Sequence, residues 1–267
     1  MKAGFGVVLA VFTLVIGAVA ILPFRVNPTA REIRTELMAE LQPVTLSNCT
    51  LQRMGSANDG GYLMCANLLD AVRSAYSYGI GPSDDWGCEI SQTYGVPVHQ
   101  YDCFSPPNDA CASGLSTFHD ECIGPRRETI DGKPFDTLVR QIARNGDSGK
   151  RLVVKIDIEG AEVDSLMSAS GRQFDQMDQL AMEIHGTDAS FLRLVRRLKR
   201  HFYLVHVHFN NQSCGVRYRP MPAWAYQVLF VNKRIGILDP SGRRPVLPHP
   251  QDAPDFAVGH DCQVAPE

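Results

Sequence analysis

Short apolar runs alternate with amphipathic stretches through most of the chain between residues 75 and 231. Apolar runs of about four to eight residues predict buried strands, and apolar residues spaced three and four apart predict helices. The alternation therefore predicts an α/β domain with a mostly parallel seven-stranded sheet and helices on both faces. The predicted strands are 75–80, 98–102, 116–122, 152–158, 179–184, 202–208 and 226–231, and the predicted helices are 84–94, 135–144, 161–168 and 190–199.

The regions on either side of this alternation follow other patterns. Ile33, Leu37 and Leu41 recur four residues apart, which predicts a short amphipathic helix in a polar stem over residues 25–57. Residues 58–236 form the predicted globular domain. The remainder, 237–267, is rich in proline and arginine, and this composition predicts an irregular or disordered tail.

The N-terminus carries an apolar segment, residues 3–22, that contains no charged residue. It has the ~20 residues that a helix needs to span a bilayer. Ala18 and Ala20 also form an A-x-A sequence, the pattern of a signal-peptidase site after an apolar run. A transmembrane signal-anchor and a cleaved signal peptide, each over residues 1–24, are both open, and both direct the rest of the chain into the secretory pathway. We favour the signal-anchor, with the domain on the luminal side.

The eight cysteines are even in number and scattered, without C-x-x-C pairs or zinc-ligand spacing. This pattern favours disulfides, with free buried cysteines as the alternative. Two glycosylation sequons, at Asn48 and Asn211, fit the same oxidising compartment. The formal net charge is −3 and no run of lysine and arginine stands on an aromatic-interleaved face, so we expect no nucleic-acid partner.

A glycine-containing turn, Gly79-Ile80-Gly81, follows the first predicted strand. Glycines at the carboxyl end of a strand let the backbone approach a ligand closely. Asp102 ends the next predicted strand about 20 residues later, the spacing at which a carboxylate binds the ribose hydroxyls of a nucleotide. Gly79, Gly81 and Asp102 are therefore candidate ligands of an adenosine-containing cofactor.

Asp84 and Asp85 stand at the start of the helix that follows this turn. Two carboxylates there repel a diphosphate, whereas they attract the ammonium and sulfonium charges of S-adenosylmethionine. We include both as candidate cofactor ligands; the alternative is that Ser83 caps the helix and the two aspartates complement its dipole. Gly124 ends the third predicted strand, at the depth where the adenine ring of such a cofactor is expected.

Lys155 and Asp157 interrupt an apolar strand on one of its faces. Burial of these charges is costly unless they pair or serve a site. Asp157 and the following Glu159 come at the carboxyl end of a central strand, where ligands of open α/β sheets bind. We therefore predict that both carboxylates line a reaction crevice. A structural pair of Lys155 with Asp157 is the alternative.

Three histidines complete the predicted catalytic residues. His185 follows the fifth predicted strand, and His206 and His208 alternate onto one face of the sixth. A histidine in the crevice is a natural general base for removing the proton of an acceptor hydroxyl. Alternatively, His206 and His208 together with Asp157 form a divalent-cation site that lowers the pKa of the acceptor.

The segment KIDIEGAE, residues 155–162, resembles the signature of the FkbM-type methyltransferases. Neighbouring segments occur in matching order: YGIG at 78–81, DDW at 84–86, YD at 101–102, DTL at 136–138 and EIH at 183–185. NDGGYLMC at 58–65 and HVHFNN at 206–211 resemble the branch of that family that contains methyltransferase-like protein 24. One departure is the last strand, AYQVLF at 225–230, where the family often has a glutamate before the apolar run.

The resemblance implies a Rossmann-like methyltransferase fold, S-adenosylmethionine as methyl donor, and O-methylation of a glycan or small hydroxylated acceptor. It assigns Gly79, Gly81 and Asp102 to the cofactor, and Asp157 with Glu159 to the reaction crevice. We expect an enzyme of the Golgi or endoplasmic reticulum membrane with a luminal domain, or a secreted enzyme if the N-terminus is cleaved.

Two other functions are open on the sequence. The first is a signal-anchored glycosyltransferase that uses Asp157-Ile158-Glu159 as a metal-binding motif for a sugar diphosphate. The second is a non-catalytic luminal binding protein that shares the fold. The acidic glycine turn fits S-adenosylmethionine better than a diphosphate, so the methyltransferase is the favoured function.

Overall fold

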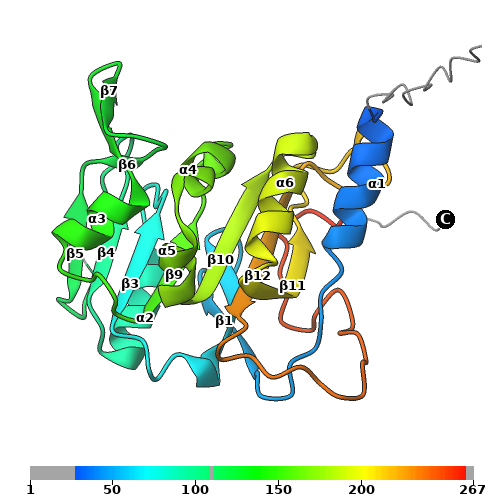
Figure 1. Ribbon diagram of the computed structural model, residues 1–267, viewed down its shortest axis with the longest axis horizontal. Helices are drawn as coiled ribbons and strands as arrows, with labels where there is room; N and C mark the ends of the chain where they lie inside the picture. The colour runs from blue at the N-terminus through cyan, green and yellow to red at the C-terminus, as the bar shows by residue number, and fades with distance from the viewer. Residues whose placement is uncertain (1–27, 109–110, 263–267) are drawn as a thin grey trace, which may run out of the picture.

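The computed structural model describes residues 28–108 and 111–262 of the chain (Figure 1). The segment predicted as a signal-anchor or signal peptide, residues 1–24, lies outside the described residues. No helix in the described part of the chain is both long and apolar enough to cross a membrane.

A seven-stranded sheet forms the centre of the molecule (Figure 1). Its strands are β3 (Ser74–Tyr78), β4 (Val98–Tyr101), β5 (Ser116–His119), β9 (Leu152–Ile156), β10 (Met177–His185), β11 (Phe202–Phe209) and β12 (Ala225–Asn232). They lie side by side in the order β11-β12-β10-β9-β3-β4-β5. Strand β12 runs antiparallel to both of its neighbours, and the other pairs are parallel.

This strand order confirms the predicted α/β class and the Rossmann-like methyltransferase fold. The chain builds outward from β3 to β5 on one side and returns through β9 on the other, so the order reverses between β3 and β9. A reversal of this kind is a topological switch point, which opens a crevice at the carboxyl ends of the two strands. The crevice is therefore expected beside Tyr78 and Ile156.

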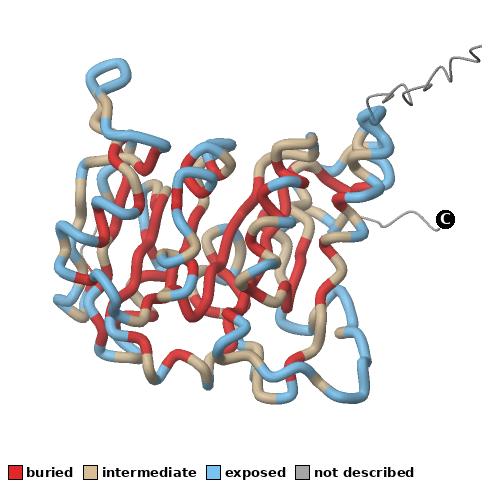
Figure 2. The backbone as a smooth tube through the Cα atoms, in the orientation of Figure 1, coloured by how far each residue is buried: buried red, intermediate tan, exposed pale blue. Residues whose placement is uncertain are grey.

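Helices and one hairpin bury the two faces of the sheet (Figure 2). The helices α1, α3, α4, α5 and α6 cover one face, where Leu37 of α1 shares a core with Val154 of β9. Helix α2 and the hairpin β1–β2 cover the other face, where Trp86 and Tyr62 share a core with Val153. Successive residues of β9 thus point to opposite cores, which explains its continuous apolar run. The bounds are α1 Ala30–Glu40, α2 Asp85–Tyr94, α3 Leu138–Arg144, α4 Glu162–Ser168, α5 Gly171–Gln176, α6 Ala189–Leu198, β1 Leu51–Gly55 and β2 Gly61–Cys65.

The connection between β5 and α3 differs from the prediction of one strand over 116–122 and one helix from residue 135. Strand β5 ends at His119, and a separate three-stranded sheet follows, made of β6 (Cys122–Ile123), β7 (Glu128–Ile130) and β8 (Lys133–Asp136). Helix α3 begins only at Leu138, because Thr137 caps it by accepting a hydrogen bond from the Arg140 amide. The β7–β8 hairpin projects beyond the carboxyl edge of the main sheet (Figure 1).

The C-terminal segment, residues 237–262, contains no helix or strand in its described part but lies against the sheet. The His206 imidazole on β11 pairs with the Asp252 carboxylate at 2.9 Å. On β12, the Gln227 side-chain amide donates to Asp255 Oδ1 at 3.0 Å. The segment is therefore irregular, and it supplies carboxylates to polar side chains of the last two strands.

All eight cysteines form disulfides, which confirms that interpretation over free buried thiols. The pairs are Cys49–Cys65, Cys88–Cys111, Cys103–Cys122 and Cys214–Cys262. The last pair fixes the C-terminal segment to the loop after β11. Disulfides persist in oxidising compartments, so this pairing is compatible with the secretory environment expected from the sequence.

Candidate active site

The glycine turn after β3 is held against the end of β9. Gly79 has φ +70°, and a Cβ atom there would overlap the carbonyl oxygen of Asp157. Its amide donates to the Tyr101 carbonyl at 2.9 Å. Gly81 has φ +56°, and a Cβ there would point into open space. Glycine is therefore required at position 79 by close packing, while at position 81 it leaves room beside the backbone.

Asp102 joins this turn to the loop that follows β4. Its Oδ2 accepts hydrogen bonds from the amides of Ile80 and Gly81, at 3.2 and 3.1 Å. Its Oδ1 accepts from the amides of Phe104 and Ser105, at 2.7 and 2.9 Å. Asp102 thus fixes the conformation of two loops, and its binding of ribose stays a prediction.

Asp84 and Asp85 lie in different environments, although both were predicted to face the cofactor. Asp84 is buried and caps α2, with Oδ1 accepting from the Gly87 amide and the Ser77 hydroxyl, both at 2.9 Å. Its Oδ2 accepts from the Gln100 side-chain amide. Asp85 is exposed at the first turn of the same helix. The two oxygens of Asp84 are therefore engaged by the protein, and Asp85 is the freer carboxylate.

A cavity of about 560 Å³ opens where β3 and β9 end. Among its lining residues, Gly79, Gly81 and Asp102 form what we call the glycine wall. Asp157 and Glu159 line the cavity as well. With Glu183 and His185 behind them, they form what we call the carboxylate wall. Gly124 does not line the cavity, but its neighbours Cys122 and Ile123 do.

Lys155 is the one basic side chain among the described residues that line this cavity. Its ammonium donates to the Gly79 carbonyl at 2.6 Å and lies 3.6 Å from Asp157 Oδ2. The Tyr62 hydroxyl donates to the same Asp157 oxygen at 2.9 Å. The Lys155–Asp157 pair, which was the alternative interpretation, therefore exists. Both residues line the cavity. The acidic residues that line the cavity are Asp59, Asp84, Asp85, Asp102, Asp157 and Glu159.

Glu159 adopts a backbone conformation that is rare for a residue with a side chain. Its φ is +53°, in the left-handed region. The side chain is 83% exposed, and its Oε2 lies 3.5 Å from His185 Nε2. Strain of this kind is often kept where it positions a functional group. The strained turn places the Glu159 carboxylate at the mouth of the cavity.

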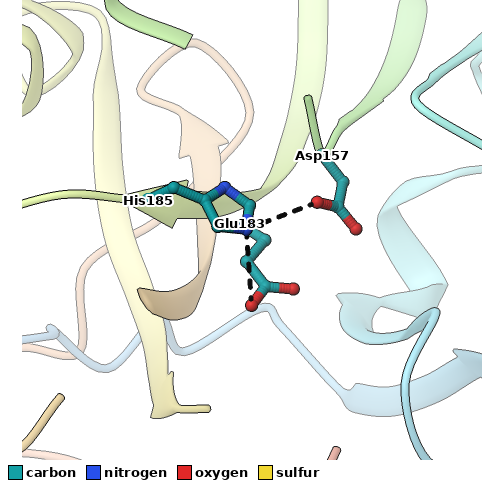
Figure 3. Close-up of side chains that lie close together, drawn as sticks. All are labelled: Asp157, Glu183 and His185. Atoms are coloured by element: carbon teal, nitrogen blue, oxygen red, sulfur yellow. Dashed lines mark ion pairs between the residues drawn. The ribbon is translucent and has the colours of Figure 1, made fainter. Parts of the chain in front are cut away.

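His185, Asp157 and Glu183 meet behind the cavity (Figure 3). Glu183 and His185 are two residues apart on β10 and so share a face, and Asp157 follows the adjacent strand β9. His185 Nε2 lies 3.8 Å from Asp157 Oδ1 and 3.8 Å from Glu183 Oε1. On the other side of the ring, Nδ1 is 2.9 Å from Oε1 of the buried Glu162.

The protonation states of Glu183 and His185 depend on each other. Burial of Glu183, together with the nearby Asp157 carboxylate, raises the pKa of Glu183 to about 8. Burial lowers the pKa of His185, but the hydrogen bond to Glu162 and the surrounding carboxylates outweigh it and raise that pKa to about 9. The raised pKa of His185 favours its protonated form, and its predicted role as general base stays a prediction.

His206 and His208 do not join Asp157, contrary to the predicted cation site. His206 pairs with Asp252, and His208 Nε2 lies 3.2 Å from Asp261 Oδ1. Neither histidine belongs to the described lining of the cavity. The physical reason is that the C-terminal segment brings its own carboxylates to this face of β11.

Several groups around the site were not among the predicted residues. Glu183 could have been found, because it precedes His185 by two residues and so shares its face of the strand. Tyr62 and Asp255 come from the β1–β2 hairpin and the C-terminal segment. Their approach to the site depends on tertiary packing, for which the local sequence gives no signal.

Comparisons with known proteins do not identify a family for this chain. No family model matches the sequence, and no curated protein matches it. Among solved structures, the crystal structure of the fibrillarin/Nop5p complex aligns over 72% of this chain and 98% of that chain, with 9% identity and a TM-score of 0.36. The assignment of the methyltransferase fold rests on the order and directions of the seven strands in the central sheet.

Proposed function

We propose that this protein is an S-adenosylmethionine-dependent methyltransferase of the FkbM type, which methylates a hydroxyl group of a glycan or small acceptor. The observation that carries the proposal is the cavity at the switch point of the sheet. It combines a glycine turn anchored by Asp102 on one wall with Asp157 and Glu159 on the other. Cofactors of open α/β sheets bind at this position.

The charge of the cavity supports this donor over a nucleotide sugar. Six acidic residues and one lysine line it. Such a lining repels a diphosphate and attracts the sulfonium and ammonium groups of S-adenosylmethionine. The glycosyltransferase alternative needs a site that offsets the charge of a diphosphate, and Lys155 is already engaged by Gly79 and Asp157.

Methyl transfer to oxygen is an in-line displacement. The bond from the methyl carbon to sulfur breaks as the bond to the acceptor oxygen forms, and S-adenosylhomocysteine leaves as a neutral thioether. The acceptor hydroxyl must lose its proton to a base. We assign this role to Glu159, because Asp157 already accepts a hydrogen bond from Tyr62 and faces Lys155, whereas Glu159 is exposed at the mouth.

The location is part of the proposal. The apolar segment 3–22 would hold the chain in a membrane of the Golgi or endoplasmic reticulum, with the domain in the lumen, or direct its secretion after cleavage. Four disulfides support an oxidising compartment. Glycans and small hydroxylated molecules are acceptors that such a compartment offers, and the acidic cavity does not favour nucleic acid.

Isothermal titration calorimetry of the full-length protein in detergent tests the donor. We expect S-adenosylmethionine and S-adenosylhomocysteine to bind, and UDP-sugars, offered with and without Mn²⁺, not to bind. Asp102→Ala is expected to lower affinity for S-adenosylmethionine at least tenfold, whereas Asp120→Ala, an exposed acid beyond β5, is expected to have no effect. Binding of UDP-sugars alone would falsify the proposal.

Transfer of a labelled methyl group to panels of glycans and small alcohols tests the reaction itself. Product carrying the label on oxygen supports the enzyme. Tight S-adenosylmethionine binding with no labelled product across both panels favours the non-catalytic binding protein instead.

A further inference from the structure

The side chains of Asp157, Glu183 and His185 converge from the ends of two adjacent strands (Figure 3). One oxygen or nitrogen atom from each lies within 4.8 Å of the other two. An octahedral cation with bonds of about 2.1 Å separates its ligand atoms by roughly 3 to 4 Å. Small rotations of the three side chains are therefore enough to place their atoms around one ion.

The unused nitrogen of His185 is a second observation that points to a ligand. The side chain is 6% exposed, and Nε2 makes no hydrogen bond to any residue that the structure describes. Nδ1 is held by the buried Glu162, which fixes the ring so that Nε2 faces Asp157 and Glu183, with the exposed Glu159 carboxylate 3.5 Å away. A histidine whose second nitrogen is held by a carboxylate is the usual arrangement behind a metal ion.

The charges around the three residues also favour a bound cation. Oxygens of two neighbouring buried carboxylates, Glu162 Oε2 and Asp255 Oδ2, have no hydrogen-bond partner among the described residues. Asp255 is close enough for its charge to act on Glu183. Two permanent cations lie nearby: Lys155, which is shared with the Gly79 carbonyl, and Arg53, whose charge acts on Asp255. Buried carboxylates in excess of their partners are costly unless a proton or a cation neutralises them.

We propose that Asp157, Glu183 and His185 bind one divalent transition-metal cation. The imidazole favours a first-row transition metal over Ca²⁺ or Mg²⁺, and the two carboxylates are compatible with Mn²⁺ or Zn²⁺. The set differs from the one expected from sequence, because the partners of Asp157 come from β10 rather than from His206 and His208 on β11.

The role of the cation rests on the proposed function. Asp157 lines the cavity, so an ion bound to it is within reach of an acceptor there. A cation that binds the acceptor oxygen lowers the pKa of its hydroxyl, and a carboxylate such as Glu159 then suffices as the base. The substrate class that fits is an acceptor with two adjacent oxygens, such as the vicinal diol of a sugar, which can bind the ion through both.

Cation binding is measured on the full-length, tag-free protein after treatment with a chelator, without methyl donor or acceptor. Electron paramagnetic resonance follows free Mn²⁺ during titration, and Zn²⁺ is tested by competition. We expect one saturable Mn²⁺ per chain, displaced by Zn²⁺, and at least tenfold weaker binding for Glu183→Gln and His185→Gln. Both substitutions preserve approximate side-chain size, and thermal melting identifies any variant that fails to fold.

His201→Gln is the matched control. His201 also pairs with a carboxylate, Asp175 at 2.9 Å, but lies outside the cluster. Its substitution is expected to leave Mn²⁺ binding unchanged. The inference is wrong if neither Mn²⁺ nor Zn²⁺ binds saturably below about 1 mM, or if folded Glu183→Gln and His185→Gln bind them as the unaltered protein does.

Calorimetry with S-adenosylmethionine in the presence of chelator separates this inference from the proposed function. Binding of the donor without any cation site overturns the inference alone. Binding of Mn²⁺ without S-adenosylmethionine overturns the methyltransferase and leaves the cation site in place.

Discussion

The two walls of the cavity differ in how their polar atoms are satisfied. On the glycine wall, the Asp102 carboxylate accepts four backbone hydrogen bonds. On the carboxylate wall, His185 Nε2 faces three carboxylates without a hydrogen bond to any described residue, and an oxygen of the neighbouring Glu162 has no partner in the described part of the chain. The first wall is complete within the protein and presents its backbone to a ligand. In our proposal, a bound cation completes the second.

This difference suggests that the glycine wall has a structural role and the carboxylate wall a chemical one. Hydrogen bonds that the protein makes to itself keep a surface rigid, which suits recognition of a cofactor that does not change from one reaction to the next. Charges in excess of their partners respond to each ion or proton that arrives, which suits acid–base chemistry. Substitutions on the first wall should therefore affect stability and donor affinity, and those on the second should affect the reaction.

Gly79→Ala is expected to have the largest effect, because Gly79 stands where the two walls meet. The added Cβ would overlap the Asp157 carbonyl, and alanine is disfavoured at φ +70°. The free energy of unfolding should fall by more than about 4 kcal/mol, measured by urea denaturation. Gly81→Ala is the control, since its positive φ faces open space, and it should cost about 1 kcal/mol. Equal losses would show that packing between the walls is unimportant.

Asp102→Asn should have the next largest effect and act on the glycine wall alone. Asparagine keeps one acceptor oxygen, so two of the four backbone amides lose their partner. We expect unfolding free energy to fall by about 2 to 3 kcal/mol, with weaker S-adenosylmethionine binding. Asp120→Asn, exposed after β5, should change stability by less than about 0.5 kcal/mol. If Asp102→Asn weakens binding at unchanged stability, Asp102 contacts the cofactor without supporting the loops.

Glu159→Gln tests the carboxylate wall in isolation. Loss of the proposed base should lower the rate of methyl transfer roughly 100-fold while affinity for S-adenosylmethionine and stability stay unchanged. Rates are compared with those of Asp164→Asn, which removes an exposed carboxylate from α4 outside the cavity. A full rate in Glu159→Gln would assign the proton to another group, and a parallel loss of donor affinity would remove the distinction between the walls.

The sequence predicted the glycine wall more completely than the carboxylate wall. The turn, Asp102 and the seven strands depend on local signals: apolar runs, glycines and acids at strand ends. The partners of Asp157 depend on which strands become neighbours, and β10 lies next to β9 while β11 is separated from it by two strands. His206 and His208 have the residue types of a cation site, yet their strand pairs with acids of a segment that has no regular structure.

Contacts made by the loops were harder to predict from the sequence than the strands were. Asp84 and not Ser83 caps α2, because a carboxylate can accept at once from the helix amide and from Ser77 on β3. The β1–β2 hairpin brings Tyr62 to Asp157, although its strands lie some 95 residues earlier in the chain. Contacts of this range arise from packing of the two cores and leave no periodic pattern.

The smallest expected effect concerns pH and the support behind the glycine wall. Tyr101 lines the cavity, and the His119 ring stacks on it with centroids 4.3 Å apart. Burial, and then the charge of the adjacent His99, lowers the pKa of His119 to about 4. Below about pH 6.5 the unfolded chain takes up a proton that the folded chain does not, so His119 makes stability fall as pH drops from 6.5 toward 4.

His119→Phe keeps the ring stack and removes the titrating group, so its melting temperature should fall less than that of the unaltered protein between pH 7 and pH 5. Because His119 is only partly buried, we expect a difference of roughly 2 °C. Part of the slope will remain, since burial also lowers the pKa of His99. The measurement is differential scanning fluorimetry in matched buffers. If both proteins lose the same number of degrees, the acid-sensitive groups lie elsewhere, and the glycine wall is supported independently of pH.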